Sequence, residues 1–142
     1  MKLLILNGPN LNLLGTREPE KYGNKSFEDY FSTLQFKFRN IELSYDQTNI
    51  EGELIDKIQK AQEDFDGVIL NAAAYTHTSV GIGDAVAAVD IPVVEVHISN
   101  TFSREEFRHK SYISPIARGI IVGFGLKSYD LAIQSFLNDQ DE

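Results

Sequence analysis

Five short runs of apolar residues recur along this sequence, and they constrain its fold more than any other feature. They occupy residues 3–6, 41–45, 68–70, 93–98 and 120–122. The segments between them place apolar residues three and four positions apart, which is the spacing of amphipathic helices. Because strands that alternate with helices run parallel and are joined by right-handed crossovers, we expect a doubly wound α/β domain.

The order of the strands follows from how polar each run is. Residues 41–45 alternate between apolar and polar side chains, as a half-exposed edge strand does, whereas residues 3–6, 68–70 and 93–98 are almost continuously apolar. This pattern favours a flavodoxin-like sheet in the order 2-1-3-4-5, with its switch point between the first and third strands. We expect one such five-stranded domain over residues 1–142, with residues 139–142 as a frayed acidic tail.

Helix starts are indicated where a hydroxyl side chain precedes an acid by three residues, which is an N-capping pattern. The pairs are Ser26 with Asp29, Thr48 with Glu51, and Ser103 with Glu106. We expect full helices after the first two pairs and a short helix after the third. Apolar spacing predicts further helices over residues 78–89 and 126–137.

The composition narrows the class of protein. There are 21 acidic and 13 basic residues and a net charge of −8, the opposite of what phosphate backbones attract, so we expect no nucleic-acid partner. The absence of cysteine rules out disulfides and thiolate metal sites. Residues 3–6 are too short for a signal peptide, and no run reaches the roughly 18 apolar residues of a membrane helix. We therefore expect a cytoplasmic protein with no membrane partner.

Polar side chains gather where the predicted central strands end. Ligands of doubly wound sheets bind beyond the carboxyl ends of the strands, at the switch point. The first strand runs into an amide-rich turn at residues 7–12, the third into Asn71 and then His77, and the fourth carries Glu95 and His97 on one face. We expect these amides and histidines to converge on one rim.

A long loop leaves the sheet at this rim. Residues 8–24 far exceed the usual βα connection of about 2–6 residues, with Gly15 and Gly23 as candidate hinges. The loop holds Arg17 and Tyr22. Because long loops beside ligand sites are often lids, we interpret residues 8–24 as a lid.

These side chains suit the elimination of water from a hydroxy-keto acid. Tyrosine is a poor base at neutral pH, but the Arg17 cation would favour a Tyr22 phenolate able to remove a proton next to a ketone. Asn12, or a water it holds, would stabilise the resulting enolate. His97, oriented by Glu95, would protonate the departing hydroxyl.

Backbone N–H groups near Ile98 and Ser99, at the start of the short predicted helix, would bind a carboxylate. None of the eight lysines lies at the carboxyl end of a core strand, so a Schiff-base mechanism lacks its amine. The sequence shows no metal-ligand spacing and no glycine-rich phosphate loop. Metal, nucleotide and Schiff-base mechanisms therefore fit the sequence less well.

Each of these residues also has a plainer interpretation. Tyr22 could be an exposed loop residue, and His77 could cap a helix. His97 could be a core histidine satisfied by Glu95. Asp84, on an apolar helix, is either a surface residue or a contact to another subunit.

Six blocks of residues match the pattern of one enzyme family in the same order and spacing. The blocks are residues 7–15, 17–23, 51–56, 71 with 74–79, 95–100 and 104–108. Through them the chain resembles the type II 3-dehydroquinate dehydratases over almost its whole length. The resemblance implies an anti elimination of water from 3-dehydroquinate through an enolate, giving 3-dehydroshikimate without cofactor or metal. It places the chain in the shikimate pathway or in quinate breakdown.

The resemblance also implies a role for each matching residue. Tyr22 corresponds to the proton acceptor, His97 to the proton donor and Arg17 to the group that activates Tyr22. Asn12 would hold a water that faces the enolate oxygen. The residues implied in substrate binding are Asn71, His77, Asp84, Ile98, Ser99 and Arg108. Asp84 matches a position that reaches a neighbouring subunit's site, since the family assembles as trimers grouped into a homododecamer.

Two departures from the family pattern stand out. Ala72 and Ala73 follow Asn71, where Pro and then Gly are usual, so this turn gains an N–H and loses a fixed φ. Gly83 precedes Asp84, where a larger residue is common.

A non-catalytic flavodoxin-like binding module is the alternative from another class of protein. A flavin carrier would purify yellow, and a signalling receiver would need acids where this chain has Asn7 and Asn71. An inactive homologue kept for assembly is a third interpretation, which the intact set of matching residues argues against.

Overall fold

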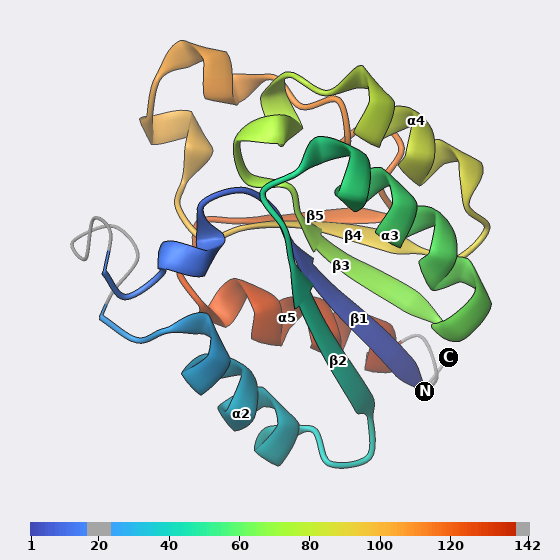
Figure 1. Cartoon of the computed structure of the whole chain (residues 1–142). Coiled ribbons are helices and arrows are strands. Elements are labelled where there is room, and N and C mark those ends of the chain that lie inside the picture. Colours follow the sequence, from blue (N-terminus) through green and yellow to red (C-terminus); the bar gives the residue numbers. More distant parts are fainter. Residues whose placement is uncertain (17–23, 139–142) are drawn as a thin grey trace.

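The computed structural model describes residues 1–16 and 24–138, and five of its segments form one parallel sheet in the order β2-β1-β3-β4-β5 (Figure 1). The strands are β1 Lys2–Asn7, β2 Glu42–Gln47, β3 Gly67–Asn71, β4 Val93–His97 and β5 Gly119–Val122. The predicted strand positions and the predicted order are confirmed. The three internal strands, β1, β3 and β4, are buried along almost their whole length, as strands covered on both faces must be.

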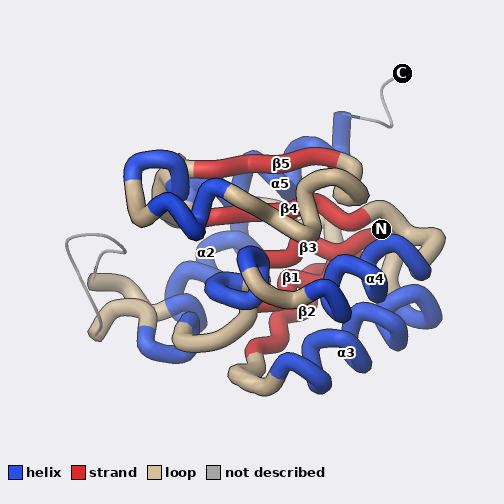
Figure 2. Tube along the Cα trace, turned by 90° about the horizontal axis from the view of Figure 1, so that it is seen from above, coloured by secondary structure: helices blue, strands red, loops and turns tan. Residues whose placement is uncertain are grey.

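Four α-helices cover the two faces of the sheet, two on each (Figures 1 and 2). They are α2 Phe27–Lys37, α3 Glu51–Asp64, α4 Val80–Ala88 and α5 Lys127–Asn138. Short 3-10 helices occupy the connections: η1 Leu11–Leu13, η2 Ala73–His77, η3 Thr101–Ser103 and η4 Glu106–His109. None of the described helices is long and apolar enough to cross a membrane.

Each face of the sheet has its own hydrophobic core. Alternate residues of β1 point to opposite faces, so Ile5 packs with α2 and α5 while Leu6 packs with α3 and α4. Phe27 and Tyr129 are almost wholly buried in the first core, with ring centroids 4.8 Å apart. Burying an aromatic side chain of this size contributes roughly 1.5–3 kcal/mol, so these two rings anchor α2 and α5 to the sheet.

Of the capping residues predicted for the starts of α2 and α3, only the one for α2 is confirmed. Ser26 caps α2 by accepting a hydrogen bond from the Asp29 N–H at 3.2 Å. The prediction for Thr48 was wrong in detail, because α3 begins at Glu51 and the Thr48 hydroxyl bonds the Glu53 carboxylate.

The short helix predicted from Ser103 does not form as one element. The segment is divided into η3 and η4 by extended backbone at Arg104. Asn100 instead starts η3, with its side-chain oxygen accepting from the Phe102 N–H at 3.1 Å. A single α-helical turn is costly to nucleate, and this segment lacks the length to extend one.

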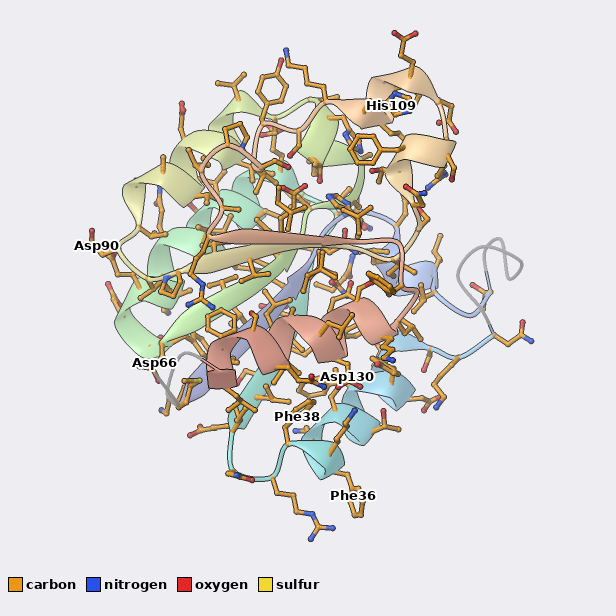
Figure 3. All side chains as sticks on the ribbon, turned by 180° about the vertical axis from the view of Figure 1, so that it is seen from behind. Phe36, Phe38, Asp66, Asp90, His109 and Asp130 are labelled. Atoms are coloured by element: carbon orange, nitrogen blue, oxygen red, sulfur yellow. The ribbon has the colours of Figure 1, made fainter. Side chains whose placement is uncertain are left out.

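The register of the sheet sets the position of the ligand rim. Asn7 lies opposite both Gln47 and Asn71, so the carboxyl ends of β2, β1 and β3 finish level with one another. In Figure 3, His109 of η4 lies at the opposite end of the molecule from Asp66 and Asp90, which precede β3 and β4. The polar residues predicted at the strand ends therefore share one end of the sheet.

Candidate active site

A cavity of about 80 Å³ lies at the carboxyl ends of the central strands, where the predicted rim was expected. It brings together all but one of the substrate-binding residues predicted from the sequence. They are Asn71, His77, Ile98, Ser99 and Arg108. His97 itself lines the same cavity. Asp84 is the exception.

The Glu95 and His97 side chains form a buried hydrogen-bonded pair in β4. Because they are two residues apart on a strand, they point to the same face, and Glu95 Oε2 lies 2.5 Å from His97 Nε2. Glu95 is 1% exposed and His97 is 6% exposed. Burial alone would raise the pKa of the Glu95 carboxyl. The hydrogen bond and charge of His97, with hydrogen bonds from Ser114 and Ser111, outweigh burial and hold that pKa below its usual range.

His77 faces His97 across the site. The two imidazole rings are stacked, with centroids 6.1 Å apart. Since a carbonyl oxygen only accepts, His77 Nδ1 donates its proton to the Lys110 carbonyl at 2.7 Å. Burial lowers the pKa of His77, and together with the charges of His97 and Arg108 it outweighs the hydrogen bond to Lys110 and the charge of Glu95, which act to raise this pKa. A neutral His77 therefore presents Nε2 as an acceptor for a ligand hydroxyl.

Asn71 is fixed by partners inside the protein. Its Nδ2 donates to the Tyr129 hydroxyl at 2.9 Å, and its Oδ1 accepts from the Ala73 N–H at 3.1 Å. The Tyr129 hydroxyl in turn donates to Asn7 Oδ1 at 2.7 Å. Because an amide nitrogen carries two protons, Asn71 keeps one for a ligand in the cavity that it lines.

The turn after Asn71 is tight because two backbones meet there. Ala73 has φ of 52°, in the left-handed region, and Ala72 is fully buried. A Cβ built on Gly8 would come within 2.6 Å of the Ala72 carbonyl oxygen, so only glycine fits at residue 8. The departure from the family's Pro-Gly pattern thus leaves the turn formed, with an alanine in a conformation that glycine adopts more easily.

Asn10, rather than Asn12, is the asparagine of the first loop that lines the cavity. Asn12 is exposed, with Oδ1 3.5 Å from Gln47 Nε2. Asn10 has a left-handed backbone with φ of 69°, and its N–H donates to Asn49 Oδ1 at 3.0 Å. The signal available in the sequence was the Gly-Pro pair before Asn10, because asparagine is one of the few residues that tolerates this conformation in a turn.

Two arginines supply positive charge to the cavity. Arg108, which was predicted, has Nε 2.7 Å from Glu105 Oε2 and its guanidinium over the Phe107 ring. Arg104 was not singled out from the sequence, yet it also lines the cavity and donates from Nη1 to Ser99 Oγ at 3.2 Å. Guanidinium groups bind carboxylates and hydroxyls well, so the cavity suits an anionic, oxygen-rich ligand.

Three predicted residues lie elsewhere. Arg17 and Tyr22 fall outside the described residues. Asp84 is exposed on α4 and does not line this cavity. The neighbouring glycine has a packing reason of its own, since a Cβ on Gly83 would come within 2.7 Å of the Tyr112 carbonyl oxygen.

The described part of the loop predicted as a lid is folded against the core. Leu11 and Leu14 are buried, and η1 lies between the strand end and Gly15. Gly15 has φ of 94°, and a Cβ there would lie 2.9 Å from the Asn24 carbonyl oxygen. The backbone segments that precede and follow residues 17–23 therefore lie in close contact at Gly15 and Asn24.

The fold and the cavity together define a parallel α/β protein with an acid–base site at its switch point. In the described ranges no three His, Asp or Glu side chains are grouped as a metal site would require. The site offers a carboxylate-bound imidazole for proton transfer, and amides and guanidinium groups for binding.

Comparison with known proteins identifies the family. Residues 1–137 match the model of the family described as Dehydroquinase class II. The 3-dehydroquinate dehydratase of Psychromonas ingrahamii is 54% identical over 137 residues, covering 95% of this chain and 92% of that protein. That of Campylobacter lari is 49% identical over 144 residues, covering 100% and 90%. The crystal structure of type II dehydroquinase from Butyrivibrio crossotus superposes with a TM-score of 0.92 at 49% identity, covering 95% and 96%. This chain belongs to the class II dehydroquinase family.

Proposed function

We propose that this protein is a 3-dehydroquinate dehydratase, a hydro-lyase of the shikimate pathway that converts 3-dehydroquinate to 3-dehydroshikimate and water. The observation that carries the proposal is His97, in the cavity wall and bonded to the buried Glu95, in a chain about half identical to proteins of that name. A carboxylate that orients an imidazole is suited to protonating a hydroxyl leaving group. The substrate's atoms equal those of the product plus water, so the reaction needs no oxidant or reductant.

The first step is removal of a carbon-bound proton by Tyr22. The Arg17 cation favours the phenolate, which takes the proton from the carbon next to the ketone. The electron pair of the broken C–H bond becomes an enolate, whose oxygen needs a hydrogen-bond donor. We assign this donor, or the water that supplies it, to Asn10 in place of Asn12, because Asn10 lines the cavity.

The second step is loss of the hydroxyl group. His97 gives its proton to the departing oxygen, the C–O bond breaks, and the enolate pair forms the new C=C bond. In an anti elimination the base and the acid approach opposite faces of the substrate. The proposal therefore requires Tyr22 and His97 to approach the substrate from opposite faces. Asn71, His77, Arg108 and the backbone at Ile98 and Ser99 hold the ring and its carboxylate.

The proposal extends to the assembly of the protein. Trimers grouped into a dodecamer would bring Asp84 of one subunit to the cavity of the next. The exposure of Asp84 on α4 supports this arrangement, because the side chain is accessible to another chain.

Ultraviolet absorbance tests the activity directly. Mixed with 3-dehydroquinate, the folded protein should produce the rising absorbance of the conjugated enone, and EDTA should leave the rate unchanged. Sodium borohydride added with substrate should not inactivate the protein, because no imine forms. A folded protein without turnover contradicts the proposed function, and inactivation by borohydride points to a lysine mechanism instead.

Tyr22→Phe tests the assignment of the base. Phenylalanine keeps the ring but removes the group that accepts the proton, so kcat should fall by roughly 10²–10⁴-fold while the substrate Kd changes little. Steady-state kinetics and equilibrium binding measure the two quantities. The matched control is Tyr75→Phe, which loses only a hydrogen bond from the Tyr75 hydroxyl to the Asn49 carbonyl. If Tyr22→Phe retains the kcat of the control, the base is a different residue.

A further inference from the structure

The Glu95 carboxylate has hydrogen-bond donors on both of its oxygens. Oε2 faces His97 Nε2 at 2.5 Å and the Ser111 hydroxyl at 3.1 Å. Oε1 accepts from the Ser114 hydroxyl at 2.6 Å and lies 3.3 Å from the Ser111 hydroxyl. An ionised carboxylate has about four acceptor positions, and three donor groups, His97, Ser111 and Ser114, point to them.

The protons of the two serines have a defined direction. Ser111 Oγ accepts hydrogen bonds from the N–H groups of Ile113 and Ser114, each at 3.0 Å. A hydroxyl has one proton and two lone pairs, so the remaining Ser111 proton must point to Glu95. Ser114 Oγ donates its proton to Glu95 Oε1, since an ionised carboxylate only accepts.

These two donors oppose the electrostatic cost of burying Glu95. Burial raises the pKa of the Glu95 carboxyl, and after His97 the hydrogen bonds from Ser114 and Ser111 contribute to lowering it. A proton shared by Glu95 and His97 resides on the group that holds it more strongly. Other titratable or charged groups from neighbouring elements also line the two hollows beside His97: His77, Arg104, Arg108 and His109.

We propose that Ser114, supported by Ser111, is a positioning residue for the acid step. Its hydroxyl fixes the Glu95 carboxylate and favours its ionised form. The proton between the two groups then stays on His97 Nε2, and the imidazole can give the proton of its other nitrogen, Nδ1, to the leaving hydroxyl. The kinetic part of this inference rests on the proposed dehydratase function. The part that concerns the carboxylate rests only on the contacts of Glu95.

The loop of residues 111–114, here called the serine-bearing loop, is held in place by contacts other than those of the Ser111 and Ser114 hydroxyl groups. Ile113 is fully buried in the core beneath α3 and α4, and the Tyr112 N–H donates to the Thr76 carbonyl at 3.0 Å. Ser114 also lines a second hollow of about 270 Å³, on the β5 side of His97. Loss of the Ser114 hydroxyl should therefore leave the fold intact, and an added methyl group has room.

Ser114→Ala is the decisive variant, because this hydroxyl bonds Glu95 whereas the Ser111 hydroxyl also holds the turn. Because this hydrogen bond reaches a charged group, we expect its loss to lower kcat at least about tenfold, with KM changed less than about twofold. Loss of the donor raises the pKa of Glu95. When the pH is lowered, the Glu95 carboxylate of the variant therefore takes up its proton, and activity falls, at a higher pH than in the wild type. The acidic limb of the kcat profile should therefore move upward.

Two matched variants separate this role from general destabilisation. Ser114→Thr keeps the hydroxyl and should restore both kcat and the acidic limb. Ser135→Ala removes a hydroxyl that donates to the Ala132 carbonyl at 2.6 Å on α5, and it should leave both unchanged. If Ser114→Ala does not fold, Ser114→Cys keeps the size with a weak donor and should lose kcat. Of Ser114→Ala and Ser114→Cys, the variant that folds is compared with Ser135→Ala. If the two proteins have the same kcat and the same acidic limb, the proposal is wrong.

A titration that needs no turnover completes the test. The ¹³C chemical shift of the Glu95 carboxyl, assigned with Glu95→Gln, reports its ionisation in the whole protein. Ser114→Ala should raise the midpoint of this titration relative to Ser135→Ala, and an unchanged midpoint refutes the positioning role. If the wild type does not turn over 3-dehydroquinate but the midpoint moves, the dehydratase function fails while the carboxylate role stands.

Discussion

Ala73 carries a backbone conformation that its own side chain disfavours. Its φ of 52° costs a residue with a Cβ roughly 1–2 kcal/mol, and part of this cost is offset because the methyl group packs against the core. Ala73→Gly should therefore increase the free energy of unfolding by about 0.5–1 kcal/mol, as measured by urea denaturation.

The same substitution in a regular helix should have the opposite sign. Ala87 is exposed within α4, where glycine costs roughly 1 kcal/mol relative to alanine. Ala87→Gly is thus the control for Ala73→Gly. If both substitutions destabilise the protein equally, the left-handed backbone at Ala73 carries no strain.

At the scale of single residues, the sequence predicted the chemistry better than the contacts. Glu95 and His97 could be paired in advance because alternate residues of a strand share a face. Asn12 was named and Asn10 was not considered, because residue type alone does not tell which amide of a turn faces the cavity. That depends on the left-handed φ of Asn10. Ser111 and Ser114 come from a loop without any periodic pattern, and their approach to Glu95 is visible only in three dimensions.

At the scale of elements, α4 and the serine-bearing loop are in close contact through Gly83. Glycine lowers helix stability by about 1 kcal/mol, so Gly83→Ala would be favourable in an isolated helix. Here the new Cβ would meet the Tyr112 carbonyl oxygen at 2.7 Å, and backbone cannot rotate away as a side chain can. Because overpacking costs about 1–3 kcal/mol, Gly83→Ala should lower stability overall, as thermal denaturation would show.

Gly52 provides the matched comparison for Gly83. It lies in the first turn of α3, and a Cβ there would meet no atom within 4 Å. Gly52→Ala should raise stability by roughly 0.5–1 kcal/mol, through helix propensity alone. A Gly83→Ala protein as stable as Gly52→Ala would show that the loop moves aside at little cost.

The elements themselves were largely predictable, with one instructive exception. The strands were found because short apolar runs that alternate with amphipathic helical segments have few other places in a fold than the core of a parallel sheet. The helix expected after Ser103 was not found, because the capping pattern indicates where a helix could start but not whether it can extend. Arg104 is extended there, and η3 and η4 are single short turns.

At the scale of the whole molecule, the proposed contribution of Asp84 to a neighbouring site can be tested by mixing two inactive variants. In a trimer made from Asp84→Asn and Tyr22→Phe chains, some sites combine an intact Tyr22 from one chain with an intact Asp84 from the next. Co-refolded mixtures should therefore recover activity that neither variant has alone. Light scattering should give a multiple of the 16.0 kDa chain mass.

Two outcomes would contradict the shared site. A particle of 16.0 kDa leaves no neighbour to supply Asp84, and a mixture that stays inactive despite forming mixed oligomers shows that both residues act within one chain.

The hydrogen bond between Tyr129 and Asn7 spans 122 residues, from the last described helix to the first strand. During translation, every residue that lines the cavity leaves the ribosome before α5 does. Until that helix emerges, the hydroxyl that joins Asn7 to Asn71 is missing, and so is one wall of the first core. A nascent chain thus carries the residues that line the cavity without the support that aligns them, and it gains a competent site only after α5 has emerged.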